Sequence, residues 1–196
     1  MNRKEMEYVF KTKDGQEIGA RPLRYTDAPN LVDIFEHMSS ESRYRRFHQT
    51  ADNLQPERIW REAESIAHLD QAKQGGLLAF ADLPGQPNTP VGAARYVCLG
   101  EGRAETAVSV RDDMQGKGIA TKLLQLLTEE ARARGIQKLV ADVMNNNVAI
   151  LTVLQKLPYV ITRKPDGQYA TLEIDLTRFK DGAGALTDEG TAVHRR

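Results

Sequence analysis

The sequence predicts a single α/β (α+β) domain with a mixed, mostly antiparallel central sheet of six to seven strands, flanked by helices. Three short apolar segments after Gly76 are separated by Pro- and Gly-rich turns, which indicates an antiparallel meander. The rest of the chain then shows a strand, helix, strand, helix, strand order, which makes the sheet mixed. With 196 residues, the chain is long enough for one hydrophobic core.

The first part of the chain predicts a hairpin and two amphipathic helices. Asp14-Gly15 lies between two short strand-like segments and tolerates positive φ, so we expect the chain to open with antiparallel strands. We expect Thr26 to cap the first helix and Pro56 to begin the second. A short basic segment lies between them at residues 42–47.

The second part of the chain predicts the meander and the elements that follow it. Apolar residues recur at helical spacing from Gly116 to Arg134, and Gly135 is typical of a helix end. Residues 147–157 predict a second helix, and Asp166-Gly167 predicts a final hairpin turn. The expected strands cover residues 77–80, 91–99, 104–110, 139–143, 159–163 and 169–175, with turns at 84–90 and 100–102.

Composition limits the kinds of partner. Lys plus Arg number 27 and Asp plus Glu number 27, so no single-sign field favours nucleic acid or a membrane surface. Cys98 has no second cysteine to pair with, and no apolar stretch follows the N-terminal residues, so we expect a cytoplasmic protein. We divide the chain into an N-terminal strand extension (1–16), the main domain (17–180) and a disordered tail (181–196). The composition does not decide the oligomeric state.

A glycine-rich turn stands between the strand at 104–110 and the long helix. The first turn of a helix has N–H groups without intrahelical partners, so a diphosphate can accept several hydrogen bonds there. Gly116 and Gly118 have no Cβ to hold such an anion away. The P-loop and dinucleotide patterns do not fit this segment. Taken alone, a Gly-x-Gly pair is more often only a sharp turn.

The context of these glycines resembles motif A of the GNAT acetyltransferase family, whose signature is Gln/Arg-x-x-Gly-x-Gly/Ala. The match falls on Gln115, Gly118 and Ala120, after Val108-Ser109-Val110. The resemblance implies a GNAT fold with splayed strands that form the coenzyme A cleft, N-acetyltransferase activity, and acetyl-CoA as cosubstrate without a metal. It implies cofactor contacts at Val108, Ser109, Val110, Gln115, Gly116, Lys117, Gly118, Ile119, Ala120, Thr121 and Asn147. For Asn147, a role as helix N-cap is equally open.

Residues 39–47 are similar to a segment of Pat-type protein lysine acetyltransferases, and Glu105 matches the general-base glutamate of those enzymes. A carboxylate that takes the proton of the attacking amine is what this chemistry requires. The other interpretation of Glu105 is a solvent-facing strand glutamate. Family geometry suggests the N–H of Val108 as the donor to the oxyanion. Leu154 stands where many relatives place the tyrosine acid, and we expect Tyr159 to pack in the core.

The acceptor is expected to be a primary amine, either a protein lysine, which the Pat-like segment favours, or a small molecule. Arg43, Arg45 and Arg46 are candidates for contacts with cofactor phosphate or an acidic substrate surface, or form a solvated helix turn. An alternative from another class is an acyl-CoA sensor without turnover. We expect no metal site, because close ligand spacing is absent among His37, His48, His68 and His194.

Overall fold

The computed structural model describes residues 5–47, 55–68, 70 and 72–181. Within this part of the chain, eight strands form one sheet in the order β1-β2-β3-β4-β5-β6-β8-β7. All neighbouring strands are antiparallel except β5 and β6, which are parallel. The strands are β1 (Tyr8–Lys11), β2 (Glu17–Pro22), β3 (Gln74–Leu83), β4 (Gln86–Gly100), β5 (Arg103–Val110), β6 (Lys138–Met144), β7 (Tyr159–Asp166) and β8 (Tyr169–Phe179).

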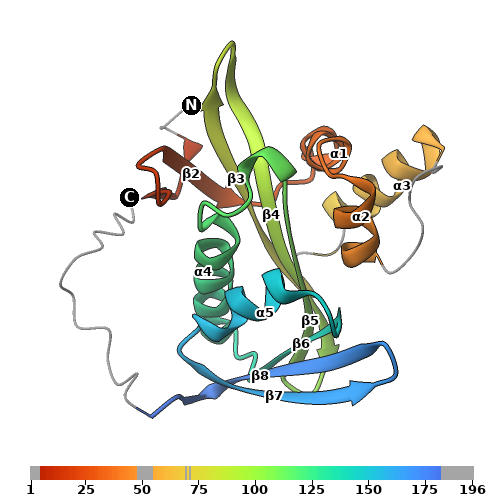
Figure 1. Cartoon of the computed structure of the whole chain (residues 1–196), viewed down its shortest axis with the longest axis vertical. Helices are drawn as coiled ribbons and strands as arrows, with labels where there is room; N and C mark the ends of the chain where they lie inside the picture. Colours follow the sequence, from red (N-terminus) through yellow and green to blue (C-terminus); the bar gives the residue numbers. More distant parts are fainter. Residues whose placement is uncertain (1–4, 48–54, 69, 71, 182–196) are drawn as a thin grey trace.

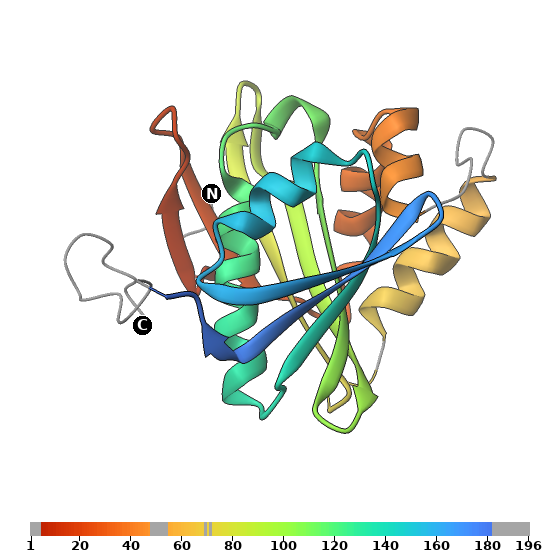
Figure 2. The same cartoon turned by 60° about the horizontal axis from the view of Figure 1, so that its bottom comes forward.

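Helices cover both faces of this sheet (Figures 1 and 2). Three helices precede β3 and lie together on one face, and two helices of the second half lie on the other. The first group is α1 (Ala28–Glu36), α2 (Ser40–Phe47) and α3 (Pro56–Ala67), and the second is α4 (Ile119–Ala133) and α5 (Val148–Gln155). The expected α/β class and the mixed sheet are therefore confirmed.

Three details of the sequence-based prediction were wrong. The sheet has eight strands in the described residues instead of six to seven, because β1 pairs with β2 and thereby extends the same sheet. The turn expected at 84–90 is much shorter, since β3 and β4 stay paired up to Leu83 and Gln86. Thr26 does not cap α1: Asp27 is the residue that precedes the helix, and its carboxylate is engaged elsewhere.

Asp27 forms a buried ion pair that joins α1 to the sheet. Its two carboxylate oxygens each accept a hydrogen bond of 2.7 Å from the guanidinium of Arg21 on β2. The side chains are 7% and 2% exposed, so the pair is withdrawn from water. Burial alone would raise the pKa of Asp27, but hydrogen bonds from Arg21, the Arg24 N–H and Asn30 lower it below its usual value.

The main core fills the space between the sheet and the helices α4 and α5. It contains Leu123, Leu124 and Leu127 of α4, packed against strand residues such as Leu77 and Leu139. A smaller core on the opposite face joins Ile34 and Met38 to Leu78 and Phe80. Each face of the sheet thus has its own apolar layer, which lets the central strands stay buried on both sides.

The ends of the chain fall largely outside the described residues. The predicted disordered tail begins at residue 181, and residues 182–196 are not described, so this expectation stays a prediction, as does the division at residues 16 and 180. Among the described helices, none combines the length and the apolar character that crossing a membrane would require.

Candidate active site

The site begins where two parallel strands separate. β5 and β6 pair only from Arg103 opposite Lys138 to Glu105 opposite Val140. Both strands then continue, β5 to Val110 and β6 to Met144, without further pairing to each other. The separation leaves a cavity of about 780 Å³ along the free edge of β5. The expected splayed strands are therefore present, and Glu105 lies at the point where they part.

The register of β5 fixes the direction of its backbone groups. The N–H of Arg111 donates to the C=O of Val91 at 3.1 Å, so these two residues form a hydrogen-bonded pair of the antiparallel ladder. Hydrogen-bonded and non-hydrogen-bonded pairs alternate, which makes Val108 opposite Ala94 a non-hydrogen-bonded pair. The N–H of Val108 therefore points away from β4, toward the edge that β6 has left.

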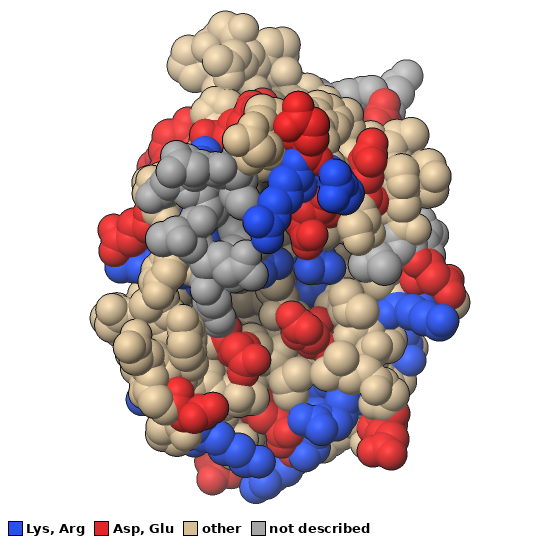
Figure 3. All heavy atoms as spheres, turned by 90° about the vertical axis from the view of Figure 1, so that its right-hand side faces the viewer, with Lys and Arg blue, Asp and Glu red and all other residues tan. Residues whose placement is uncertain are grey.

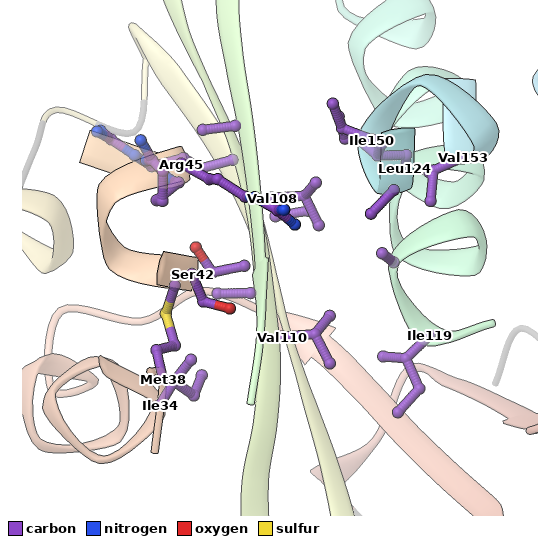
Figure 4. A pocket seen from close by; sticks show the side chains of 18 of the residues that line it. Ile34, Met38, Ser42, Arg45, Val108, Val110, Ile119, Leu124, Ile150 and Val153 are labelled. Atoms are coloured by element: carbon purple, nitrogen blue, oxygen red, sulfur yellow. The ribbon is translucent and has the colours of Figure 1, made fainter. Parts of the chain in front are cut away.

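β5 divides the cavity into two halves, as Figure 4 shows. On one side of the strand, Val108 and Val110 face apolar residues of α4 and α5. We call this side the apolar half, and define it by Val108, Val110, Ile119, Leu124, Ile150 and Val153. On the other side lie residues of the first three helices and of strands β4 and β5. We call this the charged half, and define it by Ser42, Arg45, Arg46, Glu62, Arg95 and Glu105.

The entrance to α4 opens onto the cavity. Gly116 and Gly118 have positive φ values of 73° and 94°, a conformation that side chains rarely adopt. Among the described residues, no atom lies within 4 Å of the place where a Cβ of Gly116 would stand. Near Gly118, only the aliphatic part of Lys13 comes within that distance. The side chains of the described residues thus leave the helix entrance open.

The other residues of the predicted motif have distinct local roles. The Gln115 amide donates to the carbonyl of Val110 at 3.1 Å and to the carboxylate of Asp112 at 2.8 Å, which fixes the turn between β5 and α4. Lys117 turns away, and its ammonium donates to Asp14 at 2.9 Å. Of the residues that the motif resemblance placed at the cofactor, Lys117 alone does not line the cavity. The residues that do, together with the predicted base Glu105, are Val108, Ser109, Val110, Gln115, Gly116, Gly118, Ile119, Ala120, Thr121 and Asn147.

Asn147 is the helix N-cap that the sequence left open as one of its two roles, and the cofactor contact stays a prediction. Its side-chain oxygen accepts a hydrogen bond of 3.2 Å from the N–H of Ile150, so it caps α5. It is 9% exposed and also lines the cavity. Leu154, at the position of the family tyrosine, is buried and lines the cavity as well, so it offers no proton. Tyr159 packs in the core against Phe179, as expected, with ring centroids 5.2 Å apart.

The charged half carries groups of both signs. Glu105 is exposed and shares one face of β5 with Ala107 and Ser109, as strand alternation predicted. Burial and the neighbouring Arg95 lower the pKa of Arg46 to about 10, while Glu105 and Glu62 act in the opposite direction. Burial also lowers the pKa of Arg95, whose Nε is buried and has no hydrogen-bond partner in the described part of the chain. Arg95 therefore keeps one buried N–H donor that no described residue satisfies.

The surface around the charged half shows the same mixture. Figure 3, which views the face that carries the first three helices, shows acidic and basic side chains close to one another, without a large region of one sign. Of the arginines singled out from the sequence, Arg45 pairs with Glu41 at 2.5 Å, and Arg43 lies over the ring of Phe35 at 4.4 Å. Arg45 and Arg46 line the cavity, but Arg43 does not.

Sequence reasoning missed several cavity-lining residues, among them Lys13, Glu62 and Arg95. Arg95 stands in an otherwise apolar strand segment, which is a signal that sequence alone could have supplied. Lys13 lies in a hairpin far from the motif, and no pattern in the sequence connects the two. Among the described residues, no group of three His, Cys, Asp or Glu side chains is placed to hold a metal ion. His48 and His194 lie outside those residues.

Comparison with known proteins places this geometry in a family. The model of the acetyltransferase (GNAT) domain matches residues 17–160. The acetyltransferase PA5475 of Pseudomonas aeruginosa is 27% identical over 160 residues, which cover 81% of this chain and 83% of that protein. The acetyltransferase Pat of Mycolicibacterium smegmatis is 28% identical over 168 residues, or 85% of this chain. The chain spans only 48% of the length of Pat.

A shorter stretch resembles amino-acid acetyltransferases. The L-methionine sulfoximine/L-methionine sulfone acetyltransferase of Pseudomonas paraeruginosa is 41% identical over 61 residues, 31% of this chain and 36% of that protein. Among solved structures, the GNAT domain of S. lividans PAT has a TM-score of 0.71 at 30% identity, and covers 85% of this chain and 95% of that domain. The structure of yncA from Salmonella typhimurium with acetyl-CoA has a TM-score of 0.62 at 17% identity. The match covers 88% of this chain and 99% of that chain.

Proposed function

Because the chain belongs to the GNAT family of acetyl-CoA-dependent acetyltransferases, we propose that it moves an acetyl group to a primary amine by direct attack in a ternary complex. One observation carries the proposal. The unfilled, glycine-lined entrance to α4 and the carboxylate of Glu105 line the same cavity, along the free edge of β5. A cosubstrate held at the entrance can thus extend its thioester to a proton acceptor.

In this proposal, the backbone at the entrance to α4 holds the diphosphate of acetyl-CoA. The N–H groups of residues 116–121 supply the hydrogen bonds, and the positive end of the helix dipole favours the anion. The pantetheine arm then runs along the edge of β5, in the apolar half, beside Val108, Ser109 and Val110. Ile119 and Asn147 border the same path, and Gln115 fixes the turn.

The chemical step needs a base and a donor to the oxyanion. Glu105, exposed at the fork, takes the proton of the attacking amine directly or through one water molecule and releases it to solvent. The N–H of Val108, directed toward the free strand edge, donates to the developing oxyanion of the thioester carbonyl. Leu154 cannot protonate the leaving thiolate, so its proton comes from another group.

Two classes of acceptor amine have support. The likeness to the Pat proteins over most of the chain supports a protein lysine. The buried Nε of Arg95, which has no hydrogen-bond partner in the described part of the chain, supports a small acceptor that carries a carboxylate next to its amine, since guanidinium groups bind carboxylates with forked hydrogen bonds. The short match to amino-acid acetyltransferases points in the same direction.

The experiment follows release of free thiol from acetyl-CoA with lysine peptides, amino acids, polyamines and aminoglycosides as acceptors. Glu105→Gln should lower kcat/KM by roughly 10²- to 10⁴-fold and leave the Kd of acetyl-CoA unchanged. Glu129→Gln, which changes an exposed carboxylate of α4 outside the cavity, is the matched control and should behave as wild type.

An acyl-CoA sensor without turnover is the alternative function from another class. It predicts tight binding of acetyl-CoA by the wild-type protein with no thiol release for any acceptor of the panel. Full activity of Glu105→Gln would contradict the general-base role while leaving the acetyltransferase assignment intact.

A further inference from the structure

The hairpin between β1 and β2 touches the entrance of α4, although about a hundred residues separate them in the sequence. The N–H of Lys13 donates to the C=O of Lys117 at 3.0 Å. The ammonium of Lys117 in turn donates to the carboxylate of Asp14 at 2.9 Å and reaches the amide oxygen of Gln16 at 3.5 Å. The hairpin is therefore attached to the glycine turn by both backbone and side chains.

These contacts withdraw Lys117 from the proposed phosphate site. The hydrogen bond from Lys117 is the main cause that lowers the pKa of Asp14 to about 2, so the carboxylate is ionised at neutral pH. The ammonium of Lys117 is thus held at Asp14, and Lys117 does not line the cavity. The lysine inside the motif thus serves to hold the hairpin in place.

In contrast to Lys117, Lys13 lies at the cavity. Its Cγ and Cε lie 3.7 and 3.8 Å from the place where a Cβ of Gly118 would stand, and the residue lines the cavity together with Gly116 and Gly118. Its side chain is exposed, and its ammonium forms no ion pair with any described acidic residue. Beside the open glycine turn, the hairpin therefore holds a cation that no acidic residue of the described ranges pairs with.

We propose that Lys13 contacts the diphosphate of acetyl-CoA and adds a side-chain cation to the backbone N–H groups of the α4 entrance. The inference rests on the proposed place of the diphosphate. Lys13 lies before residues 17–160, which match the family model, so this contact would come from outside the matched segment. Asp14 and Lys117 act as positioning residues, because they attach the hairpin to the turn.

The test measures the Kd of coenzyme A by calorimetry for the wild type, Lys13→Gln and Lys11→Gln. Lys11 is an exposed lysine of the same hairpin that does not line the cavity, which makes it the matched control. Lys13→Gln should weaken binding by roughly three- to tenfold at low ionic strength, and the loss should shrink as salt screens the contact. Lys11→Gln should bind as the wild type does, and Lys13→Arg should retain most of the affinity.

A second ligand shows whether Lys13 contacts the diphosphate or the 3′-phosphate of coenzyme A. Dephospho-CoA keeps the diphosphate but lacks the 3′-phosphate, so Lys13→Gln should weaken its binding by the same factor. Equal Kd values for wild type and Lys13→Gln, or a loss that disappears with dephospho-CoA, would overturn the inference. If the wild type bound neither ligand, the cofactor assignment itself would fail, which is a different result.

Discussion

The two halves of the cavity are built in different ways. One border of the apolar half is a nearly continuous segment, in which the edge of β5, the glycine turn and the first turn of α4 follow one another in the sequence, and Ile150 and Val153 of α5 face it. The charged half instead collects Arg46 of α2, Glu62 of α3, Arg95 of β4 and Glu105 of β5. Backbone groups of one segment can bind a constant cosubstrate, whereas side chains from four elements can change independently with the acceptor.

Helix α1 packs against α3, which carries Glu62 of the charged half, and the buried pair of Arg21 and Asp27 joins α1 to the sheet. Asp27→Ala leaves a buried guanidinium without its partner, so the free energy of unfolding should fall by about 3–5 kcal/mol. Chemical denaturation measures it. The double change Arg21→Met with Asp27→Leu replaces both charges by apolar side chains. It should lower the free energy of unfolding by less than Asp27→Ala alone. A cost below about 1 kcal/mol for Asp27→Ala would contradict this role.

The same pair predicts a pH dependence. The pKa of Asp27 is lower in the folded protein than its usual value of about 3.9, so its stabilising contribution is complete above that value. The contribution is lost as the pH falls through the lower, folded pKa. Asp27→Asn should therefore flatten the loss of stability at acid pH, which denaturation curves of both proteins between pH 2 and pH 6 would show.

The contrast between the halves also explains what could be predicted from the sequence. The glycine turn and the helix after it are local, so Gln115, Gly116 and Gly118 were recognised together with their element. In the charged half, the sequence predicts only Glu105 and the arginines of α2. Arg95 lies near them because β4 pairs with β5, and this pairing cannot be predicted from the local sequence. Lys117 was assigned to the cofactor, yet its side chain pairs with Asp14, a contact set by tertiary structure.

For the apolar half, Gly118→Asp is the sharpest test. The new carboxylate adds bulk and negative charge where the diphosphate is proposed to lie, so coenzyme A should bind at least about tenfold more weakly. Gly135→Asp is the control, because Gly135 has a similar φ of 81° but lies at the far end of α4. Both changes strain the backbone by a similar amount, so unchanged coenzyme A affinity in Gly118→Asp would remove the cofactor assignment.

For the charged half, Arg95→Gln distinguishes the two acceptor classes. If a carboxylate of the acceptor fills the place beside Arg95, the KM for amino acids should rise by roughly tenfold, with the KM for the matching amino-acid amides unchanged. Arg61→Gln, on the exposed side of α3 and outside the cavity, is the control. An equal effect on acids and amides, with lysine peptides as better substrates, would favour a protein acceptor.

Asn147 gives the smallest expected effect, and it both caps α5 and lines the cavity in which the cofactor is proposed to lie. Asn147→Ala removes the oxygen that accepts from Ile150 and should cost about 1 kcal/mol of stability. Asn147→Asp keeps this oxygen but loses the amide donor and adds a charge, so stability should be retained, whereas affinity for coenzyme A should fall by roughly two- to fivefold. Asn146→Asp adds the same charge at an exposed neighbour outside the cavity. If calorimetry gave the same Kd for both aspartate variants, Asn147 would act only as a cap, and the apolar half would bind its ligand without it.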